Sequence, residues 1–214
     1  MNRIELRNVL PDVFVGRDDL HSEIWKQSVT FEKGKSYLIE AASGTGKSSL
    51  CSFIFGYRSD YQGIISFDQL DIRNFSVSHW IEIRQKTIGM LFQELRLFAE
   101  LTASENVLLK NKLTGYRSIE QIKSWFDELG IADKWSRPVA KMSFGQQQRV
   151  AFIRMLCQPA DFFFLDEPVS HLDHVNGGLM ARILTEEVSK NGSGVIVTSI
   201  GQRLELNYTS RLKL

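Results

Sequence analysis

The segment Ala41-Ala42-Ser43-Gly44-Thr45-Gly46-Lys47-Ser48-Ser49 decides the fold of this 214-residue chain. It follows the short apolar run 37–39, which is typical of a buried strand, and it opens an apolar stretch at 47–55 that we expect to be helical. A loop of small residues between a strand and a helix, ending in Lys-Ser, is the context that a phosphate-binding loop requires. Its backbone N–H groups and the helix N-terminus together attract an anion. An ordinary Gly/Ser turn is the alternative, and the Lys-Ser pair at this spacing argues against it.

The residue types in this loop each suit a phosphate ligand. Gly44 and Gly46 permit a tight backbone path, and Lys47 can reach the outer phosphates as a point charge. The Ser48 hydroxyl is placed to bind Mg²⁺. The usual pattern begins with glycine, whereas this chain has Ala41, which costs on the order of 1 kcal/mol if the backbone there needs a positive φ. The predicted phosphate-binding residues are Ala41, Ser43, Gly44, Thr45, Gly46, Lys47, Ser48 and Ser49.

A second candidate site lies at the end of the apolar run 161–165, which is followed by Asp166, Glu167 and Pro168. An acid at such a strand end can hold Mg²⁺ directly or through a water. We therefore predict that Asp166 is a metal ligand and that Glu167 polarises an attacking water. The alternative is an exposed turn-forming acid, because aspartate is common where strands end.

Composition limits the possible classes of protein. The hydrophobic share of 43% and the charged share of 24% are those of a globular chain, which argues against a disordered or fibrous protein. Net charge is +1, so there is no sign of a nucleic-acid partner. No apolar run reaches the roughly 20 residues that span a bilayer, and the alternating N-terminus predicts a strand rather than a signal peptide. We expect a cytoplasmic chain whose two separated cysteines, Cys51 and Cys157, are core residues.

The pattern along the chain predicts an α/β fold. Strands are expected at 4–9, 24–31, 37–39, 63–67 and 87–92. The stretch 101–156 has helical periodicity, and within it Ser118 and Gln121 form a predicted capping box for a helix that Gly130 ends. Strands return at 161–165 and 194–198 with a helix near 179–188 between them, which indicates a parallel sheet. We predict one domain with its core at 1–92 and 158–214, and an inserted helical subdomain at about 93–157.

Three further segments carry a family resemblance. The stretch Met142-Ser143-Phe144-Gly145-Gln146-Gln147-Gln148-Arg149-Val150-Ala151 resembles the signature motif of ATP-binding cassette (ABC) ATPases. The stretch Ser170-His171-Leu172-Asp173 is similar to the D-loop of that family, and Leu91-Phe92-Gln93-Glu94 to its Q-loop. The motifs follow the order of the family and span nearly the whole chain. Residues 97–107 look most like the short ATPases of lipoprotein-release, macrolide-export and cell-division systems, a pattern that polar amino-acid importers largely share.

The resemblance implies a P-loop NTPase fold of ABC type, with a mostly parallel core sheet and an N-terminal antiparallel β part. It implies ATP and Mg²⁺ as cofactors, and a second ATPase subunit, identical or not, that closes over the γ-phosphate. That subunit would offer the Ser143 hydroxyl, the Gly145 N–H and a helix N-terminus beginning near Gln146. Gln93 would contact Mg²⁺ or the attacking water.

Membrane partners are also implied by the resemblance. Transmembrane permease subunits would hold the chain on the cytoplasmic face of the inner or plasma membrane. The apolar residues after Gln93 would form part of the groove that grips such a subunit, and ordinary subdomain core is the alternative. These residues are Leu95, Leu97, Phe98 and Leu101.

Three positions depart from the family pattern. Phe144 occupies a signature position that is normally glycine, and we expect it to be tolerated because its neighbours make the phosphate contacts. Ser199 stands where the family usually has a switch histidine, and losing one preorganised donor typically costs about 10²–10³ in rate. The adenine-stacking aromatic falls at Val13 by ungapped counting, so Phe14 is the candidate, with a core phenylalanine as the alternative and Trp25 as a distant second.

Two functions from different classes follow. The first is an ATP-hydrolysing motor subunit of a membrane transporter. The second is an ATP-clamped gating subunit with little turnover, which Ser199 and Ala41 favour and the intact Glu167 and signature oppose. A small-molecule kinase on the same fold ranks far below both, because it has no use for a signature or a D-loop.

Overall fold

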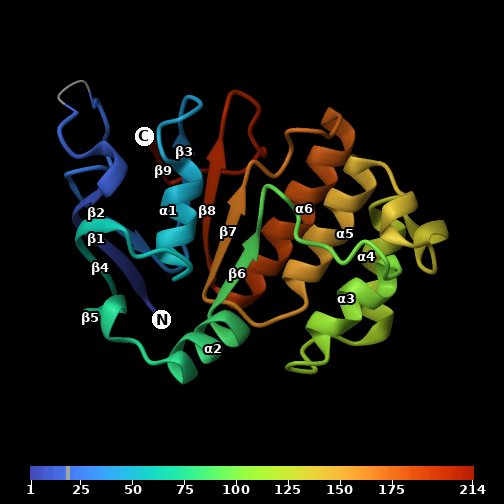
Figure 1. The fold of residues 1–214 in the computed structure, drawn as a ribbon. Helices are drawn as coiled ribbons and strands as arrows, with labels where there is room; N and C mark the ends of the chain where they lie inside the picture. Colours follow the sequence, from blue (N-terminus) through green and yellow to red (C-terminus); the bar gives the residue numbers. More distant parts are fainter. Residues whose placement is uncertain (18–19) are drawn as a thin grey trace.

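The computed structural model describes residues 1–17 and 20–214, and this part of the chain forms two β-sheets flanked by helices (Figure 1). The antiparallel sheet has the strand order β2-β1-β4-β5, and the parallel sheet has the order β6-β7-β8-β3-β9. In Figure 1 the antiparallel sheet lies on the left, the parallel sheet in the middle, and the helices α3 and α4 on the right. The α/β class that the sequence predicted is confirmed.

The antiparallel sheet is built on β1 (Arg3–Pro11), which pairs with β2 (Ser28–Glu32) and β4 (Tyr61–Phe67). A short strand, β5 (Leu70–Asp71), completes it. The β1–β4 register shifts between Arg7 and Leu10. At this bulge an added Cβ on Gly63 would stand 2.3 Å from the Asn8 carbonyl oxygen, so the close approach of the two backbones requires glycine.

The parallel sheet contains the motif-bearing strands. β3 (Ser36–Glu40) lies between β8 (Gly194–Ser199) and β9 (Ser210–Lys213), and β7 (Phe162–Asp166) lies between β8 and β6 (Ile88–Leu91). Successive side chains of a strand point to opposite faces. Phe162 and Phe164 accordingly pack in the core on the side of the antiparallel sheet, whereas Phe163 and Leu165 pack in the core formed with the helical part.

The described part of the chain has six α-helices, of which α3 and α4 pack on α5. They are α1 (Lys47–Ile54), α2 (Val77–Lys86), α3 (Ala103–Asn111), α4 (Ile119–Glu128), α5 (Phe144–Leu156) and α6 (His174–Asn191). Short 3₁₀ turns occur at Asp12–Phe14, Ile72–Asn74, Ala132–Lys134 and Val139–Lys141. Ser118 caps α4 by accepting from the Gln121 N–H, which is one of the two bonds of the predicted capping box, and Gly130 follows the helix with a φ of +63°.

The strand predicted at 24–31 is wrong in its first half. Ile24 and Trp25 lie in a turn, where both of their N–H groups donate to the Ser22 hydroxyl. Lys26 then has a φ of +59°, far from the extended conformation of a regular strand. Pairing with β1 begins only at Ser28. The side chains of Ile24 and Trp25 are buried, as their apolar pattern suggested, although they lie in a turn and not in a strand.

Two other expectations can be compared with the fold. Cys51 and Cys157 are free thiols and are buried, which confirms that they are core residues. Within residues 1–17 and 20–214, no helix combines the length and the apolar character that crossing a bilayer needs.

Candidate functional site

The predicted phosphate loop connects β3 to α1, where it leaves the carboxyl edge of the parallel sheet. Gly44 and Gly46 have φ values of +80° and +99°, which confirms that the backbone path there needs glycine. Ala41 has no positive φ, so the strain considered for its missing glycine does not arise. Its N–H donates to the Ser199 carbonyl at 3.1 Å. The Thr45 hydroxyl donates to the Ala42 carbonyl at 2.9 Å and holds the loop together.

Two buried aromatic side chains, Phe14 and Trp25, pack against the loop. The Trp25 indole N–H donates to the Thr45 carbonyl at 2.9 Å. An added Cβ on Gly46 would stand 2.9 Å from Phe14 Cε2 and 3.1 Å from Trp25 Cζ2. Phe14 is 5% exposed, whereas its neighbour Val13 is 67% exposed. The structure therefore favours the alternative for Phe14, a core residue under the loop, over an open surface on which adenine could stack.

Four polar side chains converge where α1 begins and β7 ends. Lys47 Nζ lies 3.4 Å from Glu167 Oε1, and both side chains are nearly buried. The Ser48 hydroxyl lies 3.5 Å from Asp166 Oδ2. Lys47 and Glu167 are 120 residues apart in the sequence, Ser48 and Asp166 are 118 apart, and the fold brings all four to one place. Ser49 lies one position further along α1, and its hydroxyl accepts from Arg58 Nη1 at 3.0 Å.

Asp166 is held in a buried carboxylate site. Burial raises its pKa above the ordinary value, and the hydrogen bond that the Thr198 hydroxyl donates to Oδ1 opposes that rise. The nearby Glu167 charge raises the pKa further. Asp166 and Thr198 are direct partners in the β7–β8 register, which is why this hydroxyl reaches the carboxylate. A cation placed between Asp166 and Ser48 would offset the burial of this charge.

The backbone at Glu167 is strained. Its φ is +50°, and a non-glycine residue in this region costs on the order of 1–3 kcal/mol. Its N–H donates to the Thr198 carbonyl at 3.1 Å, and its own carbonyl accepts from Gln148 Nε2 at 3.3 Å and from the Ser170 hydroxyl at 3.2 Å. These bonds hold the bend that turns the Glu167 side chain toward Lys47. Residue type and spacing did not point to a role for Thr198 or Gln148, although Gln148 lies within the quoted signature stretch.

The donor set fits Mg²⁺. A hydroxyl and a carboxylate are hard oxygen ligands, and Mg²⁺ is usually bound through one or two such groups plus phosphate oxygens and waters. Among the residues that the structure describes, no cluster of three His, Cys, Asp or Glu side chains could hold a metal alone. A Ser48–Asp166 site completed by phosphates is consistent with both observations.

Gln93 lies exposed in the loop that follows β6. The next turn has two left-handed residues, Leu95 and Arg96, with φ values of +58° and +47°. Arg154 of α5 donates to the carbonyl oxygens of both residues and so fixes the shape of the turn. The loop that contains Gln93 is thus held by the helical part of the chain.

The signature segment forms the start of α5. Ser143 is the N-cap: its hydroxyl accepts from the Gln146 N–H at 3.4 Å, and Gln146 Oε1 accepts from the Ser143 N–H at 3.1 Å. The helix begins at Phe144, two residues before the predicted start at Gln146, because this capping box fixes it there. An added Cβ on Gly145 would stand 3.1 Å from the His171 carbonyl oxygen, so the signature packs closely on the D-loop.

The two other departures from the family pattern occupy different environments. Phe144 is 41% exposed and packs its ring edge-on against His171, with the ring centroids 4.5 Å apart. Ser199 is buried at the end of β8, and its hydroxyl donates to the Gln202 carbonyl. The serine therefore lies beside the phosphate loop, and its one proton is already used in a local hydrogen bond.

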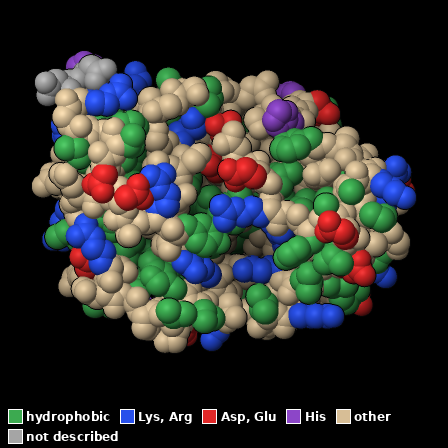
Figure 2. Space-filling view, in the orientation of Figure 1, with side chains coloured by type: hydrophobic (Ala, Val, Ile, Leu, Met, Phe, Trp, Pro, Cys, Tyr) green, Lys and Arg blue, Asp and Glu red, His purple; other side chains and the backbone are tan. Residues whose placement is uncertain are grey.

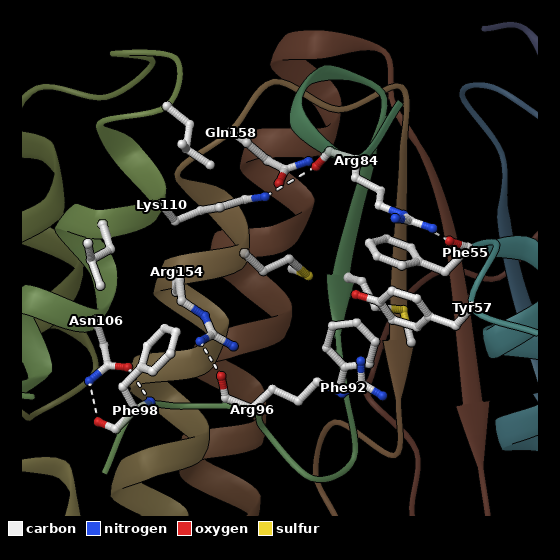
Figure 3. Close-up of a pocket in the computed structure, with 14 residues that line it drawn as sticks. Phe55, Tyr57, Arg84, Phe92, Arg96, Phe98, Asn106, Lys110, Arg154 and Gln158 are labelled. Carbon is white, nitrogen blue, oxygen red and sulfur yellow. Dashed lines mark hydrogen bonds between the residues drawn. The ribbon is translucent and has the colours of Figure 1, made fainter. Parts of the chain in front are cut away.

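A groove of about 400 Å³ lies between the aromatic side chains around Tyr57 and helices α3 and α5 (Figure 3). We call it the basic groove, because Arg84, Arg96, Lys110 and Arg154 line it. Of the apolar residues predicted to grip a membrane subunit, only Phe98 lines the groove, and it is 58% exposed. Leu95 is buried in the core and Leu97 packs, partly buried, against that core. Both are therefore better explained as ordinary core residues of the subdomain than as contacts for a membrane subunit.

Comparison with known proteins identifies the family. The family profile described as "ABC transporter" matches residues 25–170. The chain is 29% identical over 202 residues to the macrolide export ATP-binding/permease protein MacB of Aggregatibacter actinomycetemcomitans, covering 92% of this chain but only 31% of that protein. It is 28% identical to the ABC transporter ATP-binding protein YbbA of Escherichia coli K12, covering 100% of this chain and 94% of the relative. It is also 28% identical to the lipoprotein-releasing system ATP-binding protein LolD of Syntrophus aciditrophicus, covering 94% and 91%.

Solved structures agree with these relatives. The dimeric structure of MJ0796, a bacterial ABC transporter cassette, superposes with a TM-score of 0.76 at 25% identity, covering 91% of this chain and 87% of that one. A dimeric post-hydrolysis state of the same cassette, bound to ADP and Pi, gives a TM-score of 0.74 at 26% identity, covering 92% and 87%. The profile covers more than half of the chain, and the fold and motif order agree with it. The chain belongs to the ABC transporter family, as an ATP-binding cassette.

Proposed function

We propose that this chain binds Mg²⁺-ATP with residues 41–49 and hydrolyses it at an interface with a second ATPase subunit. The observation that carries the proposal is the convergence of Lys47, Ser48, Asp166 and Glu167 at one end of the parallel sheet. The similar cassette with ADP and Pi bound, and its dimeric state, support it. Ser48 and Asp166 would hold Mg²⁺, which would supply positive charge against the phosphates.

The ion pair between Lys47 and Glu167 gives the two residues linked roles. Lys47 exchanges the Glu167 carboxylate for phosphate oxygens when nucleotide binds, because a doubly charged phosphate group is the stronger partner. Glu167 is thereby released, and its carboxylate is free to orient and polarise an attacking water. Asp166, with Ser48, holds the metal, and Gln93 contacts the metal or the water from the neighbouring loop.

The second half of the site comes from the partner subunit. Ser143, Gly145 and Gln146 lie at the N-terminus of α5. Gly145 packs on the D-loop of its own chain, whereas Ser143 is exposed, so this end of the helix can face another subunit. A helix N-terminus stabilises the negative charge of a γ-phosphate. ATP then stabilises the closed dimer over the open one, and hydrolysis removes the difference. The partner is a second copy of this chain or a different ATPase subunit.

The closing and opening of this dimer would drive a conformational change in transmembrane permease subunits. Residues 1–92 and 158–214 act as the core, and residues 93–157 act as a helical subdomain that carries the signature. The basic groove lies where these two parts meet and where Gln93 begins its loop. A permease seated there places the chain at the cytoplasmic face of the inner or plasma membrane. The similarity to macrolide-export and lipoprotein-releasing proteins makes a transporter of this general type the best-supported assembly.

The experiment measures Mg²⁺-dependent phosphate release and ATP-dependent dimerisation on the same preparation. Glu167→Gln is expected to lower turnover by about 10²–10⁴ and to trap the ATP-bound dimer, because it removes the group that acts on water. Lys47→Ala is expected to lose both nucleotide binding and turnover. Glu186→Gln, an exposed change on α6, is the matched control. Unchanged turnover in Lys47→Ala would refute hydrolysis at this site.

The engaged hydroxyl of Ser199 favours a second candidate, an ATP-clamped gating subunit with little turnover. A serine that donates to Gln202 gives the γ-phosphate no donor. Single-turnover hydrolysis measured beside dimerisation separates the two functions. Dimerisation without phosphate release selects the gating subunit, and release within the lifetime of the dimer selects the motor.

A further inference from the structure

The segment that follows β7 contains a bend that needs support. Residues 166–173 leave the carboxyl end of the parallel sheet, and Glu167 lies in the left-handed region with a φ of +50°. A strained residue keeps such a conformation only where its surroundings hold it there. Figure 2 shows acidic side chains, in red, on the surface near the upper ends of the central parallel strands. The support for the bend lies beneath this surface, on helix α5.

Gln148 of α5 supplies two hydrogen bonds to the bend. Its Nε2 group donates to the Glu167 carbonyl at 3.3 Å and to the Pro168 carbonyl at 2.6 Å. Both acceptors are carbonyl oxygens, so the amide nitrogen and not the amide oxygen must face them. Two successive carbonyl groups of the chain are thereby tied to one side chain. This restricts the backbone directly after the Glu167 side chain.

The hydrogen-bonding capacity of Gln148 is satisfied only in part. The residue is 2% exposed, and among the described residues no donor contacts its Oε1 atom. Burying an acceptor without a partner destabilises a fold, whereas an apolar side chain of similar length would avoid that cost. Stability alone is therefore a poor explanation for a glutamine at this position. A buried polar group of this kind calls for a functional explanation.

Two neighbours of Gln148 hold the same segment further along. An added Cβ on Gly145 would stand 3.1 Å from the His171 carbonyl oxygen. Arg149 Nη1 donates to Asn176 Oδ1 at 2.8 Å. The first half of α5 thus contacts the chain after β7 at three places, and Gln148 makes the first of these contacts in chain order. A shift of this helix would reach the bend through Gln148.

We propose that Gln148 is a positioning residue for ATP hydrolysis, which holds the bend at Glu167 and so fixes the direction of the Glu167 carboxylate. Gln148 is too deeply buried to touch nucleotide or a partner subunit, so its effect passes through Glu167. The carboxylate lies 3.4 Å from Lys47 Nζ, and the bend keeps it facing residues 41–49 after nucleotide takes the lysine. This inference rests on the proposed function, because it names the residue that positions the group proposed to act on water.

The first experiment measures the bend itself in the nucleotide-free chain. Gln148→Met keeps the length of the side chain but removes the donor and the unpaired acceptor. The Glu167 N–H donates to the Thr198 carbonyl and the Ser170 N–H donates to the Glu167 carbonyl, so hydrogen exchange of these two amides reports on the bend. We expect both amides to exchange about tenfold faster in Gln148→Met. Equal exchange rates in the variant and the wild type would overturn the inference.

Gln158→Met is the matched control. Gln158 is equally buried, and its Nε2 group donates to the Ile88 carbonyl at 2.8 Å. Ile88 begins β6, at the opposite end of the parallel sheet from the bend, so we expect unchanged exchange at Glu167 and Ser170. Gln148→Asn keeps an amide but is one methylene shorter, and it gives a second, milder variant for the same measurements. Melting temperatures of all three variants show that they are folded.

The second experiment separates nucleotide binding from chemistry. Mg²⁺-dependent phosphate release is measured for the wild type and the variants. A misplacement of about 1 Å costs on the order of 10²-fold in rate, so we expect Gln148→Met to lower kcat by about 10- to 100-fold. The KM for ATP and the affinity for a fluorescent ATP analogue should stay within about twofold, because residues 41–49 are untouched. Gln158→Met is expected to keep the wild-type kcat and KM.

A double variant tests whether Gln148 acts through Glu167. In Glu167→Gln the carboxylate that Gln148 positions is already gone, so adding Gln148→Met should lower single-turnover hydrolysis no further. A residue with a merely structural role would lower the rate by the same factor in both backgrounds. Equal factors would therefore overturn the inference, and so would an unchanged kcat in Gln148→Met.

The failure of this inference can be told apart from the failure of the proposed function. A wild-type chain that binds no ATP analogue refutes the proposed function, whereas hydrogen exchange in the nucleotide-free chain still decides whether Gln148 holds the bend. A wild-type chain that binds ATP and dimerises but releases no phosphate in a single turnover refutes the positioning role, because Glu167 then assists no attack by water. Normal wild-type turnover with unchanged kcat or unchanged exchange in Gln148→Met refutes only the role of Gln148.

Discussion

Alanine at Gly46 tests how the phosphate loop is supported. Gly46 has a φ of +99°, and its added Cβ would stand 2.9 Å from Phe14 Cε2. The backbone conformation costs an alanine about 1–2 kcal/mol. Overpacking against a buried ring adds about 1–3 kcal/mol. The smaller entropy of the unfolded alanine chain returns about 0.4–1 kcal/mol. The expected net loss is about 2–4 kcal/mol in the free energy of unfolding.

Gly44 provides a matched control in the same loop. Its φ is +80°, but an added Cβ there meets nothing within 4 Å. Gly44→Ala therefore has the backbone cost without the clash, and we expect a loss of about 0.5–1 kcal/mol. For a chain of this length, 1 kcal/mol corresponds to about 2–4 °C in melting temperature. Gly46→Ala should then melt about 4–16 °C lower than wild type, and Gly44→Ala only about 1–4 °C lower.

The assay is thermal unfolding of the nucleotide-free chain, followed by circular dichroism and repeated in urea. A third variant, Phe14→Leu combined with Gly46→Ala, removes the ring that the Cβ meets. The two changes should then couple favourably by about 0.5–3 kcal/mol. Equal melting temperatures for Gly44→Ala and Gly46→Ala, with additive behaviour in the double variant, would refute the packing of Phe14 beneath the loop.

Three other outcomes follow from the burial of charged and nucleophilic groups. Burial raises the folded-state pKa of Asp166, so its ionised form destabilises the folded chain at pH 7. Asp166→Asn should therefore raise the melting temperature at pH 7, and this gain should vanish as pH falls through the folded-state pKa. An unchanged melting temperature at pH 7 contradicts this. Burial raises the pKa of Cys157 to about 12, so a thiol reagent at neutral pH should label it only after unfolding, and rapid labelling of the native chain contradicts this. The Glu187 side chain is 2% exposed and paired with Arg117, so Glu187→Ala should lower the free energy of unfolding, measured in urea, by about 3–5 kcal/mol. Glu128→Ala, in the more exposed pair with Arg182, should lower it by less than about 1 kcal/mol. Similar urea midpoints for the two variants would contradict the importance of burial for the Glu187 pair.

Local patterns were enough to predict the parts of the fold that short segments determine. The strand and helix on either side of residues 41–46, the strand that ends at Asp166 and the N-cap of α4 depend on residues a few positions apart, and the structure has all of them. The helix α2 escaped prediction because only Ile83 of its ten residues is fully buried, which leaves little apolar periodicity. The strand β9 is short and lies at the sheet edge, so its half-exposed pattern resembles that of a loop.

In the candidate site too, local sequence patterns identified some residues and missed those whose contacts depend on the rest of the fold. Residue type and spacing identified Lys47, Ser48, Asp166 and Glu167 as candidates. They did not identify Thr198, because its contact with Asp166 depends on the register between β7 and β8, which no local pattern encodes. The Phe14 prediction depended on counting along a loop, and counting could not show that a 3₁₀ turn buries the ring, which favours the core interpretation.

The position of β3 in the parallel sheet bears on how the protein is made in the cell. Both neighbours of this strand, β8 and β9, come from residues 194–213, so they leave the ribosome after the other strands of the sheet. The loop that follows β3 is translated more than 150 residues before β8 and β9 are complete, so it lacks their lateral support until then. A nascent chain released before that point would present β3 as an unpaired apolar edge open to chaperones or to aggregation.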